Sequence, residues 1–381
     1  MRILHVMPHL PGVSEVWLQR TIGLLAEDTV ALAVEGADLN VFEGLPIVTL
    51  YPRQPLWWRV LFRAGIKLRR PRNIPQGMNE NLRLAIERYC PDTVVVHFLN
   101  LATELRETLQ SFPGRVLVHA HGFDATWDFR LFESPEVKHF PPEYPTRVRQ
   151  LASKARLIAN SQFMSSQLQS IGIPADRVRL KYFGFDPVRT GSRERKNQLL
   201  FVGRLVEVKG PVLMLKVFER ACEKGFEGSI RLIGDGYLAE ACARFQAGSR
   251  FGDRMILSGP QDPAVCAQAY AESSLFVSHN ILGPRTCQCE AFGVVFLEAL
   301  ANGLPVVSTL SGGIPEIVTH NETGLLSDPH DLEAQADNIL ALTHDHARWE
   351  AMAQRGRERV AKHFSVRQEK TSWKKLLAET E

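Results

Sequence analysis

The sequence predicts an α/β protein with two domains, each built on a parallel, doubly wound β-sheet. Short apolar segments with the pattern of buried strands alternate with helical segments along both halves of the chain. The 381 residues amount to about twice the length of a usual domain. Between the halves, residues 186–197 (DPVRTGSRERKN) combine proline, glycine and a run of charges, which is typical of a domain junction.

Composition narrows the class of protein. Hydrophobic residues make up 45% and charged residues 23%, as in globular proteins. The start, MRILHVMPHLPG, has too short an apolar segment for a signal peptide, and no run of about 18 apolar residues predicts a membrane span. The six cysteines lack the paired spacing of a structural zinc site, so we expect reduced thiols in a cytoplasmic protein. The formal net charge of +3 gives no support for nucleic-acid binding.

The first half opens with a buried strand at residues 2–8, a turn that contains Gly12, and a helix with an apolar stripe. This is the start of a Rossmann-like unit, whose ligand lies outside the carboxyl end of the strand. Because Gly12 is the only glycine of the turn, the GxGxxG fingerprint of a dinucleotide cofactor is absent. Further elements are expected as strands at 30–34, 47–50, 93–96, 115–119 and 157–159, and as helices near 78–88 and 161–170.

Polar residues follow two of these strands. His97 ends one of them, and the next leads into HAHGFDA, which contains His119, His121, Gly122 and Asp124. Parallel sheets bind ligands at this edge, so His121 is a candidate for ligand contact. A satisfied structural histidine is equally open, and Gly122, which lets backbone approach a ligand, favours the functional interpretation.

A basic, aromatic segment lies between Tyr51 and Asn73. From Arg53 to Arg72 it contains six arginines, one lysine, two adjacent tryptophans and no acidic residue. One interpretation is an interfacial helix that contacts an anionic membrane surface or a lipid diphosphate on the inner face of the cell membrane. The other is a solvated basic helix whose tryptophans pack on its own domain.

The second half repeats the alternation and predicts a second Rossmann-like domain. Arg204 follows Gly203 at a strand end, and Lys209 stands where the next helix begins, so both cations can face one edge and hold a diphosphate. Gly234 belongs to a tight GDG turn after another strand. The expected strands are 199–202, 230–233, 254–257, 275–278 and 306–308.

The stretch CEAFGVVFLEALANGLPVV reads as a loop, a helix, a stop and a strand. A helix that begins near Gly293 points unpaired N–H groups at the loop, where they can hold a phosphate. Glu298 would lie about one turn inside that helix and Glu290 just outside it. Two acceptor-only carboxylates suit a ligand with sugar hydroxyls on both sides of a diphosphate. A glutamate favoured only by the helix dipole is the plainer explanation.

Three segments carry a resemblance to a known family. Residues 203–210, the Glu290-to-Glu298 stretch and the Gly-Gly-x-Pro-Glu turn at 312–316 together resemble retaining glycosyltransferases of glycosyltransferase family 4. The likeness covers most of the chain and implies the GT-B architecture, two Rossmann-like domains facing a central cleft. It also implies that a C-terminal helix at 363–381 crosses back to the first domain. We therefore expect domains at 1–188 and 197–362.

The resemblance also implies a binding site for a nucleotide-sugar donor. Arg204 and Lys209 would hold the diphosphate with backbone amides near Phe292, Gly293 and Val294. Glu298 would take the ribose hydroxyls, Glu290 the transferred sugar, and His121 would lie across the cleft. Gly12, Gly203 and Gly234 are counted with this donor site. No metal or cofactor is expected. The departures are the single glycine of the first turn and the cysteines Cys287 and Cys289 just before Glu290.

The expected function is retaining transfer of a hexose-type sugar from a UDP or GDP sugar to a hydroxyl of a glycan or lipid-linked acceptor. The HGFDA and GIPEIV segments look like those of branches that build bacterial polysaccharides. Two alternatives stay open. A nucleotide-sugar epimerase on the same frame would change the sugar without an acceptor. A non-catalytic sugar-nucleotide-binding or membrane-docked protein would bind donor without releasing nucleoside diphosphate.

Overall fold

The computed structural model describes residues 1–11, 16–35, 39–51, 74–126, 143–188, 196–285 and 287–379. The chain divides into two compact units. The first contains Met1–Ala125, His139–Ala159 and Ser165–Leu180, and the second contains Asn160–Met164 and Lys181–Glu381. The predicted mixed α/β fold with parallel sheets is confirmed in both units.

The first unit is built on an eight-stranded sheet in the order β3-β4-β2-β1-β5-β6-β7-β8. All neighbours pair in parallel except β3 and β4, which form an antiparallel edge. The six strands predicted in this half are all present, whereas β3 and β8 were not predicted. The strands are β1 (Ile3–Met7), β2 (Thr29–Val34), β3 (Val41–Phe42), β4 (Leu45–Thr49), β5 (Thr93–His97), β6 (Arg115–His119), β7 (Arg156–Ala159) and β8 (Val178–Leu180).

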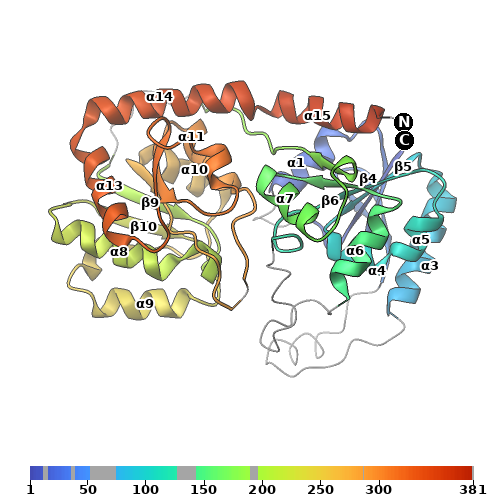
Figure 1. Ribbon diagram of the computed structural model, residues 1–381, viewed down its shortest axis with the longest axis horizontal. Coiled ribbons are helices and arrows are strands. Elements are labelled where there is room, and N and C mark those ends of the chain that lie inside the picture. The colour runs from blue at the N-terminus through green and yellow to red at the C-terminus, as the bar shows by residue number, and fades with distance from the viewer. Residues whose placement is uncertain are drawn as a thin grey trace. The chain divides into compact units, whose positions relative to one another are not determined.

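Helices cover this first sheet. The stripe on α1 packs Leu18 and Ile22 against Met7 and Leu32, as the apolar spacing predicts. In Figure 1, α4, α5 and α6 gather on one side of the sheet. The helices are α1 (Val16–Leu24), α3 (Ile74–Tyr89), α4 (Leu99–Glu104), α5 (Arg106–Ser111), α6 (Tyr144–Ala152) and α7 (Gln162–Ser170), with a 3₁₀ turn at Ala175–Arg177.

The second unit has a six-stranded parallel sheet in the order β11-β10-β9-β12-β13-β14. The chain runs outward from β9 to β11 in one direction and from β12 to β14 in the other. The strand order therefore reverses between β9 and β12, where such sheets bind ligands. The strands are β9 (Gln198–Val202), β10 (Ser229–Ile233), β11 (Met255–Leu257), β12 (Leu275–Val277), β13 (Val306–Thr309) and β14 (Gly324–Ser327).

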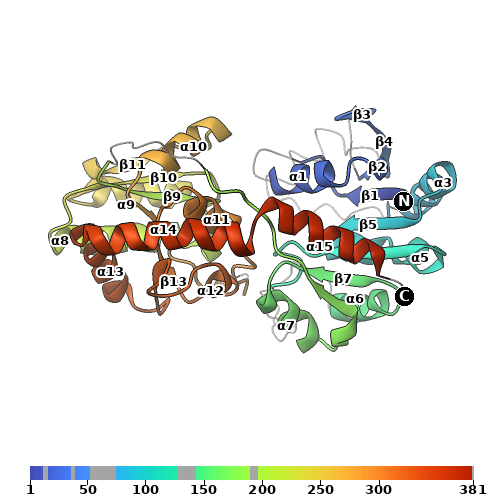
Figure 2. The same ribbon diagram turned by 90° about the horizontal axis from the view of Figure 1, so that it is seen from above.

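Helices lie on both faces of the second sheet. Figure 1 shows α8 and α9 on one face and α10 and α11 on the other, and Figure 2 shows α14 running along the unit beside α11 and α13. The helices are α8 (Pro211–Glu223), α9 (Ala239–Gly248), α10 (Pro263–Glu272), α11 (Val294–Ala301), α12 (Ile314–Ile317), α13 (Leu332–His344), α14 (His346–His363) and α15 (Val366–Ala378), with 3₁₀ turns at Glu207–Lys209 and Gly252–Arg254.

Some expectations lie outside this description. The basic segment from Arg53 to Arg72 and the turn at Gly12 fall outside the described residues, as does most of the junction at 186–197. The crossing of the C-terminal helix to the first domain stays a prediction. Among the described residues, none of the helices combines the length and apolar character that a membrane span needs.

A buried ion pair fastens α15 to the start of the second unit. Lys181 Nζ donates to Glu369 Oε1 at 2.6 Å, and both side chains are fully shielded from water. The backbone N–H of Gly184 donates to the other carboxylate oxygen at 2.8 Å. The ammonium also lies over the rings of Phe183 and Trp373. A charge this deeply buried requires its partner, because water cannot replace it.

We expect Glu369→Ala to lower the free energy of unfolding by about 3–5 kcal/mol, because it leaves the Lys181 ammonium buried without its carboxylate. Urea unfolding followed by circular dichroism measures the change. The exposed Glu358→Ala on α14 is the matched control and should unfold like the unsubstituted chain. The double variant Lys181→Met/Glu369→Leu should recover most of the loss. Equal midpoints for Glu369→Ala and the control would contradict the assignment.

Candidate functional site

The candidate site forms at the strand-order reversal of the second sheet. After β9 the chain passes through Gly203 and the exposed Arg204 to the 3₁₀ turn Glu207–Lys209, and Gly210 then caps α8. After β12 it reaches Asn280. Because β9 and β12 are adjacent parallel strands, these two loops leave the same edge of the sheet.

Glu290 joins the two loops. Lys209 Nζ forms an ion pair with Glu290 Oε2, and Asn280 Nδ2 donates to the same oxygen at 2.9 Å. The carboxylate and ammonium side chains are 10% and 18% exposed, so the pair is held in place yet reachable by a ligand. The structure thus brings together two predicted site residues that are 81 positions apart.

The helix predicted to begin near Gly293 is confirmed as α11. Gly293 is its N-cap with a φ of 91°, a left-handed conformation that suits glycine, and no side chain among the described residues caps the helix. The first amides of the helix, from Val294 on, therefore point their N–H groups at the loop after Glu290. The side chain of Phe292 is buried against Tyr182, Phe183 and Phe364, so only its backbone is available to a ligand.

Glu298 is the fifth residue of α11, about one turn in as expected. Tyr270 Oη donates to Glu298 Oε2 at 2.9 Å. Burial and then the charge of Glu298 raise the pKa of Tyr270 well above its ordinary value, so the phenol stays protonated and remains a donor. Tyr270 and Asn280 are site residues that sequence reasoning missed, and no local motif marks either of them.

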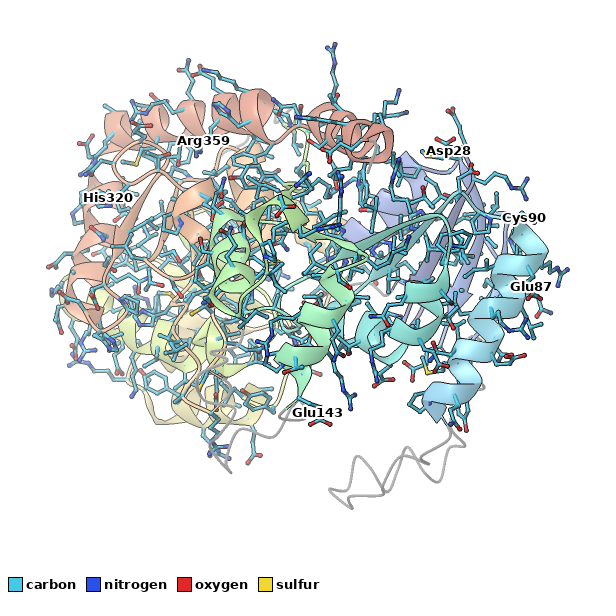
Figure 3. The ribbon with its side chains drawn as sticks, turned by 45° about the vertical axis from the view of Figure 1, so that its right-hand side comes forward. Asp28, Glu87, Cys90, Glu143, His320 and Arg359 are labelled. Atoms are coloured by element: carbon cyan, nitrogen blue, oxygen red, sulfur yellow. The ribbon has the colours of Figure 1, made fainter. Side chains whose placement is uncertain are left out.

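The SGGIPE turn, residues 311–316, holds the backbone of Glu290. Gly313 N donates to the carbonyl oxygen of Glu290 at 2.9 Å. Arg359, labelled on α14 in Figure 3, donates to the carbonyl oxygens of Glu316 and Ile317 at 2.8 Å and so fixes the end of α12. The function of this turn is therefore to hold the backbone that carries Glu290.

Glu316 has a separate task that sequence reasoning missed. Its carboxylate accepts hydrogen bonds from the backbone N–H groups of Gln162 and Phe163, at 2.7 and 2.8 Å, and from Tyr182 Oη at 3.0 Å. Burial and the neighbouring Glu316 charge raise the pKa of Tyr182 far above its usual range. Glu316 is therefore a capping residue for the start of α7 rather than a ligand-binding group.

Gly234 contributes close packing. Its φ is 141°, and a Cβ at this position would overlap the carbonyl oxygen of Gly203. Gly203 and Gly234, two of the glycines counted with the donor site, thus allow the loops after β9 and β10 to touch. The backbone bond from Leu205 N to the carbonyl oxygen of Asp235, at 2.8 Å, continues this contact.

The first unit holds the remaining predicted residue, His121, within a group of histidines. His121 Nε2 lies 3.2 Å from His97 Nδ1, and the Trp17 ring lies 4.2 Å from the His121 ring, centre to centre. His97 Nε2 in turn lies 3.0 Å from His5 Nδ1. Burial lowers the pKa of His5 to about 4, so this ring is neutral near pH 7. Gly12, the last predicted residue, lies outside the described part of the chain.

The second unit is similar to a known protein family. Residues 184–359 match the family described as "Glycosyl transferases group 1". The chain carries a glycosyl transferases group 1 domain. The matched residues include the Lys209–Glu290 pair and all of α11, so the resemblance seen in the sequence is confirmed at the level of this glycosyltransferase domain.

Two relatives and one solved structure are similar over longer stretches. The putative colanic acid biosynthesis glycosyltransferase WcaL of Salmonella typhimurium is 27% identical over 288 residues, 73% of this chain and 68% of WcaL. The GDP-mannose-dependent alpha-(1-6)-phosphatidylinositol monomannoside mannosyltransferase of Mycobacterium tuberculosis is 26% identical and is matched over 65% of either chain. The structure of Anabaena HepE in complex with UDP superposes with a TM-score of 0.75 at 18% identity, covering 99% of this chain and 100% of HepE.

These solved neighbours establish the fold. HepE, a glycosyltransferase from Rickettsia africae and TarM share it over nearly the whole chain, which confirms the predicted GT-B fold class. In the glycosyltransferase domain, Glu290, Lys209 and the N-terminus of α11 lie at the sheet edge where parallel sheets bind ligands.

We expect Gly234→Ala to destabilise the glycosyltransferase domain by at least about 1–3 kcal/mol, because the backbone is strained for alanine and the new Cβ meets a carbonyl oxygen that cannot move away alone. Thermal unfolding measures the loss. Gly248→Ala is the matched control, since a Cβ at the end of α9 meets open space. It should leave stability equal or slightly higher. Equal losses in the two variants would contradict the close-packing argument.

Proposed function

We propose that the protein is a retaining, metal-independent glycosyltransferase. It transfers a hexose-type sugar from a UDP or GDP sugar to a hydroxyl of a glycan or lipid-linked acceptor in bacterial polysaccharide or glycoconjugate synthesis. The single observation that carries the proposal is the Lys209–Glu290 pair beside the N-terminus of α11, whose N-cap is Gly293. Such an arrangement combines positive charge for a diphosphate with an acceptor for sugar hydroxyls.

Lys209 and Arg204 supply the charge chemistry. An ammonium has three donors, so Lys209 can hold Glu290 with one and a phosphate oxygen with the others. Arg204 is exposed and lies one residue after Gly203, where its guanidinium can close on the diphosphate. The cations stabilise the negative charge that develops on the departing phosphate, which is the role that a divalent metal would otherwise have.

Glu290 and Glu298 bind opposite ends of the donor. Glu298, oriented by Tyr270, accepts hydrogen bonds from the ribose hydroxyls. Glu290, oriented by Lys209 and Asn280, accepts hydroxyls of the transferred sugar. His121 belongs to the proposal as the first-domain residue beside that sugar, on the strength of the family resemblance.

Retention follows from attack on the face that the phosphate leaves. The departing phosphate oxygen accepts the proton of the acceptor hydroxyl while the sugar passes through a loose, oxocarbenium-like state. Double displacement would need a carboxylate beneath the anomeric carbon. Both candidate carboxylates already have assigned tasks, which favours the same-face route.

The relatives support the substrate classes. HepE was solved with UDP, and the mycobacterial relative is named for GDP-mannose, so either nucleotide suits the proposal. WcaL is named for colanic acid, a product of the polysaccharide class. Contact with an anionic membrane through the segment from Arg53 to Arg72 is part of the proposal and rests on its sequence.

We expect Lys209→Met to reduce the transfer rate by roughly 10²–10³-fold, because a fixed positive group at the leaving phosphate is lost. Release of nucleoside diphosphate with a matched donor and acceptor measures it. The exposed Lys216→Met on α8 is the control and should keep full activity. Thermal unfolding of both variants verifies that they fold. Transfer by Lys209→Met within a few-fold of the control would remove the proposed site.

A panel of UDP and GDP sugars identifies the donor. A true donor at 100 times its dissociation constant should stabilise the protein by about 2.7 kcal/mol and raise its melting temperature. Glu298→Ala should abolish this shift, whereas the exposed Glu240→Ala on α9 should keep it. A sugar altered without acceptor would identify an epimerase, and a shift that is never followed by nucleotide release would identify a binding protein.

A further inference from the structure

Three histidines of the first unit bring their ring nitrogens close together. His97 ends β5, His119 ends β6, and His121 follows two residues later. The two strands are parallel neighbours, and His97 and His119 are paired in register across them. One ring nitrogen from each of the three histidines lies within 4.8 Å of the other two. We propose that His97, His119 and His121 bind a divalent transition metal, with zinc as the best fit.

The spacing of the ring nitrogens suits such an ion. Tetrahedral zinc with nitrogen ligands at ≈ 2.0–2.1 Å keeps those nitrogens about 3.3 Å apart. His97 Nδ1 and His121 Nε2 already lie 3.2 Å apart. A metal would replace the proton between these two nitrogens. The third nitrogen, from His119, lies within 4.8 Å of both, so the His119 ring must move closer to complete the set.

Neighbouring groups hold the proposed ligands in the required state. If His97 binds the metal through Nδ1, its Nε2–H donates to His5 Nδ1, 3.0 Å away, and this bond fixes the tautomer. The backbone around His121 is fixed as well, because Asp124 Oδ1 accepts hydrogen bonds from the N–H groups of His121 and Gly122 at 2.9 and 2.8 Å. Its other oxygen accepts Leu99 N at 2.7 Å.

The donor set decides the class of metal. Imidazole nitrogen binds zinc, copper, iron and nickel, whereas magnesium and calcium prefer oxygen. The Asp124 oxygens accept backbone hydrogen bonds and stand outside the ligand set. Three protein ligands leave the fourth position of a tetrahedral ion open to water. A metal on His121 would exclude the sugar contact proposed above for this residue, so the two assignments compete for His121. The ion is detected without any sugar nucleotide, so the titration decides between them separately from the transfer reaction.

Metal titration of the full, tag-free chain tests the proposal after removal of bound metal with chelator. We expect one equivalent of Co²⁺ to produce the intense visible absorption of a tetrahedral nitrogen site, and Zn²⁺ to displace it. Zn²⁺ should also raise the melting temperature. His119→Gln should lose both responses, whereas His346→Gln, at an exposed site on α14, should keep them. His5→Gln keeps the three ligands and should weaken binding by roughly 10–100-fold.

The outcomes decide the matter in either direction. Failure of the unsubstituted protein to bind one equivalent, or equal binding by His119→Gln and His346→Gln, would overturn the proposal. His121→Gln, at the least buried of the three positions, repeats the test with a ligand that is not in the sheet interior. Circular dichroism confirms that each variant is folded before its titration is compared.

Discussion

The candidate site depends on how one nearly buried carboxylate, that of Glu290, is held in place. Taken as a whole residue, Glu290 is 8% exposed to solvent. Its carboxylate accepts hydrogen bonds from Lys209 Nζ and Asn280 Nδ2, and its backbone carbonyl oxygen accepts one from Gly313 N. Removing Lys209 would leave the carboxylate without its counter-charge, which a protein interior tolerates poorly. The loops after β9, β12 and β13 are linked through Glu290, because Lys209 and Asn280 hold its side chain and Gly313 holds its backbone.

This linkage explains why the site residues can sit on loops and still be well placed. The Lys209 and Asn280 loops leave adjacent strands at the point where strand order reverses, so the sheet sets their separation. Tyr270 on α10 extends the same principle to α11, because its protonated phenol orients Glu298. A rigid scaffold that delivers polar groups from several strand ends is the usual way in which such sheets form ligand sites.

Sequence patterns predicted the fold well where burial leaves a clear signature. β1 and β5 are completely buried, so each reads as a mainly apolar run without the alternation of a half-exposed strand, although His5 and His97 lie in them. The short edge strands β3 and β8 were missed because two or three residues carry no usable period, and partly buried side chains blur it further. The start of α11 was predicted because Gly293 marks it locally.

The site was predictable only as far as local motifs reach. Lys209 and Glu290 stand in recognisable segments, and the structure brings them together. Tyr270 lies 28 positions from Glu298, and its partnership arises from packing between helices that no short pattern encodes. His5 was missed for the same reason, because its contact with His97 spans 92 positions and forms only when β1 and β5 pair. Pairings of this kind depend on the register of the finished sheet.

The two sheets offer different nitrogen chemistry at comparable places. The second sheet presents an ammonium and the amides of α11, which attract an anion and repel a cation. The first sheet presents imidazoles at the ends of β5 and β6, next to the reversal between β1 and β5. Imidazole lone pairs coordinate a cation. The type of nitrogen at each edge therefore determines whether that edge suits an anion or a metal ion.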